Sequence, residues 1–454
     1  MGRQLHIALL PMIAPGHMIP MLDMAVLFTS RGLKTTIIGP PAFAGSIKGA
    51  RESGHDIGLS IINFPPKRSS LPNNLVSFDQ MVTPDLLPKF FEALALLQEP
   101  AEELLQELSP DCLISDTFLP WTADSAAKFG IPRLVFHGTS CFALCLLEHI
   151  PQLPQSLLED DNNNEFAKLQ EQRRESEGRS YGVIFNSFYE LESAYADHYK
   201  KVLGRSAWHI GPLWLCSDTR AKEKAVRGNE SSVKEHKCLA WLDSKMPNSV
   251  VYVCFGTIVS FTPTQLHEMA VGLESSGQDF IWVVRKGKSE GENEDWMHQG
   301  YEDRIKGRGL IIRGWAPQVM ILDHPAIGAF VTHCGWNSTL EGICGGVPMV
   351  TWPVFAEQFY NEKLVTEVLR TGVSVGSKKW QTVANEGVPS EAVTKAVGRV
   401  MAGEEALAMR KRAKYYKEMA RKAVEEGGSS YNSLNAFIDE LSIYCSPLKK
   451  QDIN

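Results

Sequence analysis

The stretch IGAFVTHCGWNSTLEG, residues 327–342, is the part of the sequence that decides the fold. Its first residues, 327–332, form an apolar run that predicts a buried strand, and a helix is predicted to begin at 336–338. A strand that passes into a helix after a short turn is the repeating unit of a parallel sheet covered by helices. The start of such a helix presents unpaired backbone N–H groups and a partial positive charge, so this turn suits a diphosphate.

Short apolar runs alternate with segments of helical spacing along the rest of the chain. In the first half, apolar runs fall at 5–10, 33–38, 58–62, 111–115, 132–136 and 181–186, and helical spacing fills 18–30, 85–107, 120–129 and 190–202. The polar, charged segment at 217–237 is typical of an interdomain linker. Beyond it, strands are predicted at 249–255, 280–285, 309–313, 327–332 and 347–350, with helices beginning near 263, 317, 336, 357 and 390. The alternation predicts an α/β protein with two Rossmann-like domains facing across a cleft.

Size and composition favour a two-domain protein without basic surfaces. A chain of 454 residues is too long for a single compact core, so two domains are expected. The net charge of −7 argues against a nucleic-acid or anionic-membrane partner, since both select basic surfaces. No run of about 18 apolar residues occurs, so no membrane-spanning helix is expected. The cysteines are scattered without CxxC spacing, which indicates free thiols and favours a cytoplasmic location.

Two polar residues at strand ends in the N-terminal half are candidates for proton transfer. His17 lies in the turn after the first predicted strand, and Asp116 follows the apolar run 111–115. Because parallel strands end at one edge of a sheet, both side chains can converge there. A histidine can take a proton from a hydroxyl near neutral pH, and a carboxylate bonded to the imidazole fixes its tautomer. His17 could instead cap a helix or lie in the core, and Asp116 could be a turn or helix-cap carboxylate. Asp124, in the following helix, is a weaker candidate because it is expected to face away from the cleft.

Polar residues also follow the predicted strands of the C-terminal half. Glu341 lies about one turn into the helix that begins at 336–338, where a carboxylate can accept both hydroxyls of a ribose. Glu357 and Gln358 open another helix, and adjacent polar side chains there can bind the vicinal hydroxyls of a hexose. Taken singly, these residues could be ordinary solvated helix residues.

The segment 315–358 resembles the donor-binding box of plant secondary-product UDP-glycosyltransferases. It contains WAPQ at 315–318, HCGWNS at 333–338, Glu341, GGVP at 345–348 and EQ at 357–358. The resemblance extends over residues 5–442 and is carried outside the box by IPRLVFHGTSCFA at 131–143, SYGVIFNSFYELE at 180–192 and MARKAVEEGGSS at 419–430. It looks closest to the branch that includes tobacco-type salicylate and hydroxycoumarin glucosyltransferases.

The resemblance implies the GT-B glycosyltransferase fold and a division of labour between the domains. An N-terminal domain at 1–225 is expected to bind the acceptor and a C-terminal domain at 226–430 the UDP-sugar, while a helix within 431–454 packs back on the first domain. The residues implied to bind the donor are Thr257, Trp315, Ala316, Gln318, His333, Gly335, Trp336, Asn337, Ser338, Glu341, Glu357 and Gln358. His17 matches the family's general base and Asp116 its partner.

The implied activity is inverting transfer of glucose from UDP-glucose to a hydroxyl of a small lipophilic plant metabolite, giving a β-glucoside. Gln358 ends the box, and in the family a glutamine there goes with UDP-glucose. Flavonoids, coumarins, phenolic acids and terpenoids are acceptors in the branch. An apolar acceptor pocket is predicted from Phe118, Leu119, Phe142 and Phe188. Relatives carry a longer segment at the point where Ile150 here runs directly into PQLP. Because that segment borders the acceptor pocket in the family, the identity of the acceptor is not determined.

Other function classes fit the sequence less well. No Asp-x-Asp pair is present, and His324, His333 and Cys334 lack the further ligands of a metal site, so neither a metal nor another cofactor is expected. No G-x-G-x-x-G follows the first strand, which argues against a nicotinamide-dependent dehydrogenase. A glycoside hydrolase would need two carboxylates flanking the bond. A catalytically silent UDP-sugar-binding protein and another UDP-sugar donor stay open, and a monomer is expected.

Overall fold

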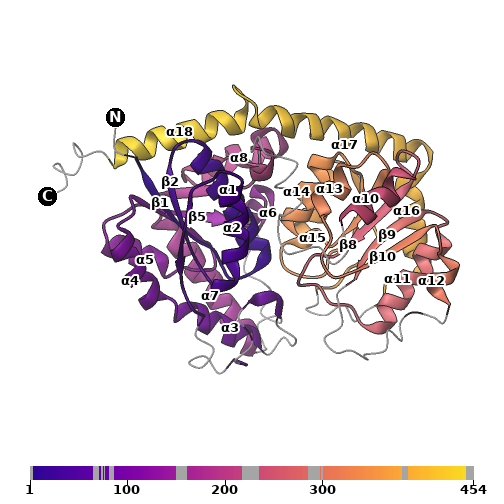
Figure 1. Ribbon diagram of the computed structural model, residues 1–454, viewed down its shortest axis with the longest axis horizontal. Helices are drawn as coiled ribbons and strands as arrows, with labels where there is room; N and C mark the ends of the chain where they lie inside the picture. The colour runs from indigo at the N-terminus through magenta and orange to yellow at the C-terminus, as the bar shows by residue number, and fades with distance from the viewer. Residues whose placement is uncertain are drawn as a thin grey trace. The chain divides into compact units, whose positions relative to one another are not determined.

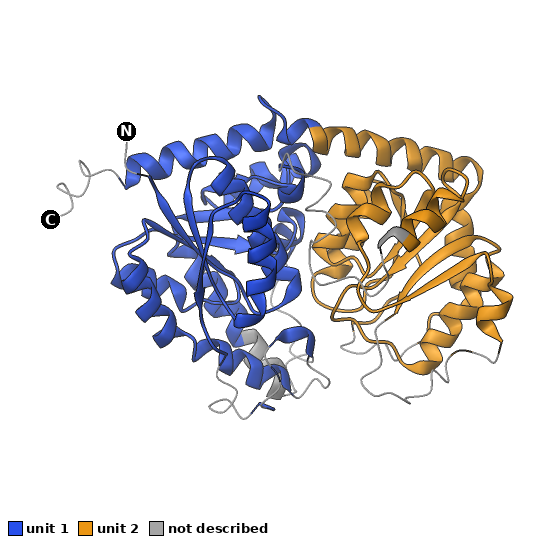
Figure 2. Cartoon of the chain, viewed as in Figure 1, with its two compact units in different colours: residues 1–223, 422–454 blue, residues 224–421 orange. Residues whose placement is uncertain are grey.

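The structure of the protein is a computed structural model. It describes residues 4–64, 71, 72, 75, 77–80, 86–149, 161–216, 235–284, 297, 300–380 and 387–445. The chain forms two compact units: unit 1 comprises Met1–Glu223 with Lys422–Asn454, and unit 2 comprises Lys224–Arg421 (Figure 2). Within the described residues, no helix has the length and apolar character needed to cross a bilayer.

Unit 1 contains a parallel sheet of seven strands in the order β3-β2-β1-β4-β5-β6-β7. Figure 1 labels three of these strands, β1, β2 and β5, among the helices of the unit. Its strands are β1 (His6–Leu10), β2 (Lys34–Gly39), β3 (Ile57–Ile61), β4 (Cys112–Asp116), β5 (Arg133–His137), β6 (Gly182–Phe185) and β7 (Ala207–His209). Its helices are α1 (Pro15–Ser30), α2 (Ala44–Glu52), α3 (Leu86–Ala95), α4 (Gln98–Leu108), α5 (Thr122–Lys128), α6 (Cys141–His149), α7 (Asp161–Gly178), α8 (Tyr189–Val202) and α18 (Ser429–Tyr444).

Both faces of the unit 1 sheet are covered by helices. Successive strand residues point to opposite sides of the sheet, so alternate residues of β1 pack against different helices. Ile7 and Leu9 of β1 pack in a layer with α1, α2 and α18. Ala8 and Leu10 pack in the opposite layer with α3, α4 and α5. In the first layer α18 contributes Phe437, which is fully buried. Burying a side chain of this size stabilises the fold by about 1.5–3 kcal/mol, so the final helix is an integral part of unit 1.

Unit 2 is a parallel sheet of six strands in the order β10-β9-β8-β11-β12-β13. Its strands are β8 (Val250–Cys254), β9 (Asp279–Val284), β10 (Gly309–Arg313), β11 (Ile327–Thr332), β12 (Met349–Thr351) and β13 (Gly372–Ser374). Its helices are α10 (Glu235–Asp243), α11 (Pro263–Ser275), α12 (Tyr301–Arg304), α13 (Gln318–Asp323), α14 (Trp336–Gly345), α15 (Gln358–Lys363) and α16 (Ser390–Met401). The long helix α17 (Gly403–Val424) carries the chain from unit 2 into unit 1.

The α/β class with two Rossmann-like domains is confirmed, but one predicted helix is wrong. The segment 85–107 forms two helices, α3 and α4. Pro100 lies in the first turn of α4, where a missing N–H is tolerated, whereas inside one continuous helix it would break a hydrogen bond. The predicted linker at 217–237 lies outside the described residues except for 235–237, and the short segment after Ile150 lies outside them as well.

Each sheet reverses its strand order at one point. In unit 1, β1 lies between β2 and β4, and in unit 2, β8 lies between β9 and β11. In open α/β sheets, ligands bind beyond the carboxyl ends of the strands at such a reversal. The ends of β1 and β4, and those of β8 and β11, are therefore where functional side chains should gather.

Candidate active site

His17 lies in the first turn of α1, directly beyond the end of β1. Pro15 occupies the first helical position, where its fixed φ favours helix initiation and its missing N–H is tolerated. The imidazole packs close to Gly138, which follows β5: a Cβ on that glycine would come within 3.2 Å of Cε1 of His17. A side chain at Gly138 would therefore press on the histidine.

His17 and Asp116 meet at the reversal point of the unit 1 sheet, as the sequence predicted. Asp116 is the last residue of β4, which pairs with β1. Nδ1 of His17 lies 2.6 Å from Oδ2 of Asp116, and Oδ1 of Asp116 accepts a hydrogen bond of 3.0 Å from the Phe118 backbone N–H. The Asp116 side chain has no exposed surface, whereas 19% of the His17 side chain is exposed. Nδ1 is thus held by the buried carboxylate, while the imidazole ring stays accessible to a ligand.

The environment of Asp116 keeps its carboxylate ionised. Burial acts to raise the pKa of this carboxyl, but the neighbouring His17, the Phe118 N–H and the charge of Arg173 outweigh it and lower the pKa below its usual value. An ionised carboxylate can stabilise the imidazolium that forms when His17 accepts a proton.

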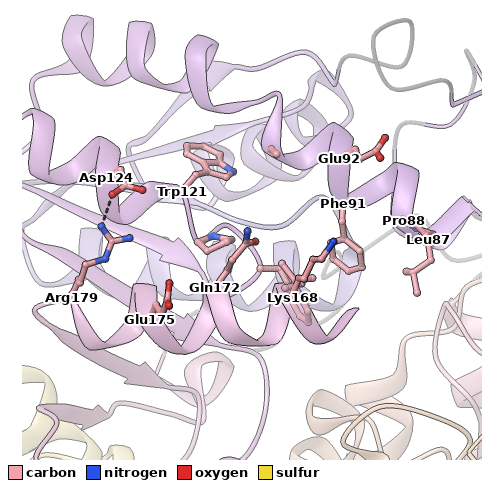
Figure 3. Close-up of a pocket in the computed structure, with 14 residues that line it drawn as sticks. Leu87, Pro88, Phe91, Glu92, Trp121, Asp124, Lys168, Gln172, Glu175 and Arg179 are labelled. Carbon is pink, nitrogen blue, oxygen red and sulfur yellow. Dashed lines mark hydrogen bonds and ion pairs between the residues drawn. The ribbon is translucent and has the colours of Figure 1, made fainter. Parts of the chain in front are cut away.

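Phe118 connects this pair to a cavity of about 470 Å³ in unit 1. Its ring meets His17 edge-on at 5.6 Å and stacks with Phe91 of α3 at 5.8 Å. Figure 3 shows the cavity between α3, α5 and α7, with an ion pair between Arg179 and Asp124 at one end. Asp124, the weaker candidate for the carboxylate, was expected to face away from the cleft, and in the structure it lines this cavity. The cavity wall therefore combines aromatic surface with charged residues.

The other predicted pocket residues lie in the core of unit 1. Leu119 and Phe188 have no exposed surface, and 5% of Phe142 is exposed. Phe142 packs edge-on against Tyr195, with ring centroids 4.7 Å apart. Strand-end position does not distinguish a core aromatic from one that lines a cavity. Of the four residues, Phe118 alone lines the cavity described above.

In unit 2, His333 and two glycines lie just beyond the ends of β8 and β11. Gly256 follows β8 with φ +68°, a conformation that favours glycine, and a Cβ there would lie 2.9 Å from Cε1 of His333. A Cβ on Gly335, the N-cap of α14, would collide with Nε2 of the same ring. Burial lowers the pKa of the half-buried His333 to about 4, so its imidazole is neutral at pH 7. The absence of side chains at both glycines makes room for the His333 imidazole beside the start of α14.

Three predicted donor residues form one hydrogen-bond network. The Gln318 amide, at the start of α13, donates to Ser338 Oγ at 3.2 Å and to Glu341 Oε2 at 2.7 Å. Its oxygen accepts a hydrogen bond from the Tyr252 hydroxyl at 3.3 Å. Ser338 and Glu341 are both 6% exposed, and hydrogen bonding of this kind offsets the cost of burying polar groups. The network links α13 to the first turns of α14.

Gln358 is held by the turn that precedes α15. Its Oε1 accepts hydrogen bonds from the backbone N–H groups of Val354 and Phe355, at 2.9 and 3.1 Å, which leaves the amide nitrogen as its donor. Ala356 in the same turn has φ 55°, an uncommon value for a residue other than glycine. Backbone strain of this type clusters at functional sites. Glu357, beside Gln358, is half-buried.

The remaining predicted donor residues differ in how much of their side chains can reach a ligand. Thr257, Trp315 and Asn337 are half-buried. Ala316 is 7% exposed and Trp336 is 1% exposed, so their side chains belong to the core and only their backbones could contribute. No group of three His, Cys, Asp or Glu side chains suited to a metal occurs in the described part of the chain.

Two residues that the sequence did not reveal support these sites. Asn361 of α15 is fully buried, and its amide donates to the Cys334 carbonyl at 2.9 Å. This hydrogen bond holds Cys334, which has φ 65°, directly before α14. Arg173 of α7 donates to Thr117 Oγ1 at 3.0 Å, beside Asp116. Both contacts join segments far apart in the chain, so no local pattern could have identified them.

Comparison with known proteins shows which family the chain belongs to. The profile of the UDP-glucoronosyl and UDP-glucosyl transferase family matches residues 224–405, and that of a glycosyltransferase N-terminal domain matches residues 3–214. A scopoletin glucosyltransferase of Nicotiana tabacum is 55% identical, covering 98% of this chain and 99% of that protein. An anthocyanin 3'-O-beta-glucosyltransferase of Gentiana triflora is 50% identical, covering 97% and 99%.

A solved structure has the same fold throughout. Glycyrrhiza uralensis UGT73P12, complexed with glycyrrhetinic acid 3-O-monoglucuronide, is 40% identical and matches with a TM-score of 0.87 over 100% of this chain and 98% of that one. Nine-tenths or more of both partners is aligned in all three comparisons, so the likeness extends over both units. The chain is a UDP-glycosyltransferase and belongs to the plant secondary-product family of these enzymes.

Proposed function

We propose that the protein transfers glucose from UDP-glucose to a phenolic hydroxyl of a small lipophilic plant metabolite, such as a flavonoid, coumarin or phenolic acid, with inversion to a β-glucoside. The observation that carries the proposal is the 2.6 Å contact between Nδ1 of His17 and the fully buried Asp116. The names of the similar proteins, a scopoletin and an anthocyanin glucosyltransferase, support the choice of donor and acceptor class.

In the proposed reaction, His17 acts as the general base. Because Nδ1 is bonded to Asp116, Nε2 takes the proton from the acceptor hydroxyl. The acceptor oxygen forms a bond to the anomeric carbon while the bond from that carbon to UDP breaks, and UDP leaves with the electron pair. Attack from the side opposite UDP converts the α-linked donor into a β-glucoside. A positioned general base accelerates such a step by about 10²–10⁴-fold.

The donor is proposed to bind in unit 2. Trp315 would stack on the uracil and Gln318 would read its polar edge, while Glu341 accepts the ribose hydroxyls. The diphosphate is proposed to lie at the start of α14, where first-turn N–H groups and Nε2 of His333 can donate. The same donors would stabilise the negative charge on the departing UDP. If Nε2 of His333 carries the proton, Nδ1 is the unprotonated nitrogen. This fits its surroundings, because Nδ1 is buried and has no hydrogen-bond partner among the described residues.

The sugar and the outer phosphate are proposed to meet three further residues. The Gln358 amide, whose oxygen is occupied by two backbone N–H groups, would donate to a glucose hydroxyl. Glu357 would accept from a neighbouring hydroxyl, and the Thr257 hydroxyl would donate to the diphosphate. The acceptor is proposed to lie beside His17 and Phe118, where aromatic surface suits a flat ring. Neither metal nor cofactor is required by this arrangement.

We further propose that the protein acts as a cytoplasmic monomer. All nine cysteines are free, which supports a reducing compartment. Gel filtration and fractionation of the native tissue would test the two parts of this proposal separately.

The proposed function is tested by mass spectrometry of the purified protein with UDP-glucose and a panel of flavonols, coumarins, phenolic acids and terpenols. We expect one product heavier by an anhydrohexose unit, and its loss in His17→Ala. UDP-glucose binding without any product, across the whole panel, would contradict the proposed transferase activity and favour a binding protein.

A different donor sugar is the second candidate. A solved structure of Arabidopsis thaliana UGT89C1 complexed with UDP-L-rhamnose is 31% identical with a TM-score of 0.80, so this fold accepts another nucleotide sugar. The same assay run with UDP-rhamnose, UDP-galactose, UDP-xylose and UDP-glucuronate in place of UDP-glucose would distinguish the donors.

A further inference from the structure

Arg173 contacts both residues that directly follow Asp116. From the half-buried face of α7, its Nε donates to Thr117 Oγ1 at 3.0 Å, and its guanidinium carbon lies 4.4 Å from the centre of the Phe118 ring. A third contact, from Nη1 to Gln170 Oε1 at 2.8 Å, fixes the guanidinium against its own helix. A cation over an aromatic ring is attracted to it, so the guanidinium, itself held by Thr117 and Gln170, holds the Phe118 side chain in place.

Phe118 in turn contacts both members of the histidine–aspartate pair. The Phe118 N–H donates to Oδ1 of Asp116 at 3.0 Å, and the Phe118 ring meets the His17 imidazole edge-on at 5.6 Å. The carboxylate and the imidazole are therefore both in contact with the residue that Arg173 holds. A shift of Phe118 would move the wall against which His17 packs and weaken a hydrogen bond to Asp116.

We propose that Arg173 is a positioning residue for sugar transfer: it holds Thr117 and Phe118 so that His17 and Asp116 keep the geometry needed for proton removal. The inference rests on the proposed function of His17. The positive charge of Arg173 also supports the pair, because it favours the ionised form of Asp116, after His17 and the Phe118 N–H. Arg173 touches neither reacting atom in this scheme and acts through its neighbours.

Arg174 provides a matched control on the same helix. It is 48% exposed and pairs with Glu171 at 2.8 Å and Glu148 at 3.7 Å. Replacing Arg174 therefore removes the same charge from α7 without touching the segment that follows Asp116. Any effect of Arg173 that Arg174 does not share reflects its specific contacts.

The test compares Arg173→Met, Arg173→Lys and Arg174→Met with the wild-type enzyme, using an acceptor identified in the product assay. Arg173→Met should lower kcat by about 10- to 10²-fold, the loss expected from misplacing a catalytic group by about 1 Å. KM for UDP-glucose should stay within about two-fold of wild type, because the proposed donor residues lie in unit 2. Arg173→Lys, which keeps the charge but not the planar fork, should recover part of kcat. Arg174→Met should match the wild type.

Equal kcat values for Arg173→Met and Arg174→Met would overturn the inference, as would parallel losses in kcat and UDP-glucose affinity. If Arg173→Met does not fold, Thr117→Val takes its place, because it removes only the hydroxyl that Arg173 contacts; an unchanged kcat in Thr117→Val would then overturn the inference. An inactive wild-type enzyme would contradict the proposed function itself, so the two failures are distinguishable. In a double-mutant cycle, Thr117→Val should cost less in the Arg173→Met background than alone.

Discussion

Unit 1 and unit 2 place their predicted functional residues at the same point of the same kind of sheet, yet they form two different kinds of site. At the ends of β1 and β4, unit 1 brings a histidine 2.6 Å from a fully buried carboxylate. At the ends of β8 and β11, unit 2 surrounds a neutral His333 with two glycines and the start of a helix. The strand reversal fixes where a site forms, and the local residues decide its chemistry.

The two histidines show how the local residues produce this difference. His17 has an ionised partner that stabilises its protonated form, which suits a group that must accept a proton during the reaction. Burial instead favours the neutral form of His333, which suits a hydrogen-bond donor that keeps one protonation state. Under the proposed function, one fold would thus supply a proton acceptor in one unit and fixed donors for an anion in the other.

The largest effect expected from this division is that of His17→Ala. Removing the base should lower kcat by about 10²–10⁴-fold, the usual contribution of general base catalysis. UDP-glucose binding should be nearly unchanged, because the residues proposed to hold it belong to unit 2. Initial rates and calorimetric titration with UDP-glucose would check the two parts. Loss of both turnover and binding to the same degree would contradict the separation of roles between the units.

Acidification should destabilise both units through one histidine in each, His209 in unit 1 and His333 in unit 2. Burial lowers the pKa of His209 in β7 and of His333 from 6.5 to about 4. Between these pKa values the folded state therefore binds fewer protons than the unfolded state. The stability that the neutral histidines contribute is fully present above about pH 6.5 and is lost as the pH falls toward about 4. A difference of about 2.5 between folded and unfolded pKa values corresponds to about 3 kcal/mol for a fully buried group, and to less for the half-buried His333.

Urea unfolding of the wild type, His209→Gln and His333→Gln near pH 7 and about pH 4.5 measures this effect. Each variant should lose less stability on acidification than the wild type, and His209→Gln should show the larger difference because His209 is only 7% exposed. Identical losses in all three proteins would show that neither histidine titrates in this range.

Gly335→Ala should affect the unit 2 site alone. The added methyl group would collide with Nε2 of His333 at the start of α14, so UDP-glucose affinity should fall by about 10-fold, or about 1.4 kcal/mol. The control is Gly398→Ala in α16, where an added Cβ meets nothing within 4 Å. Titration with UDP-glucose measures both variants. Wild-type affinity in Gly335→Ala would mean that the diphosphate does not approach this glycine.

The parts of this molecule that the sequence could predict are those encoded in adjacent residues. The strand at 327–332, the turn after it and the helix at 336–338 agree with β11 and α14, because apolar periodicity and glycine placement act over a few residues. The pairing of His17 with Asp116 was also predictable, since both follow strands and parallel strands end at one edge of a sheet. The three-residue edge strands β7 and β13 are too short to produce a pattern.

Contacts between distant segments were not predictable in the same way. Arg173 reaches Thr117 across 56 residues of sequence, and Asn361 reaches Cys334 across 27. From the sequence alone, an arginine on a polar helix is expected to be a solvated side chain. Only tertiary packing shows that a residue from a distant segment contacts it. Phe142 and Phe188 illustrate the reverse case, because aromatic residues near strand ends turned out to be core residues.

The smallest effect is expected from Gln358→His, which tests whether unit 2 reads the sugar as well as the diphosphate. Oε1 of Gln358 accepts two backbone N–H groups, from Val354 and Phe355, whereas an unprotonated ring nitrogen of histidine can accept only one. The loss of one such hydrogen bond costs about 0.5–1.5 kcal/mol, so kcat/KM for UDP-glucose should fall by about 2- to 10-fold. Parallel assays with UDP-galactose should show a smaller fall or a gain. Equal changes for both donors would show that Gln358 supports the turn before α15 without selecting the sugar.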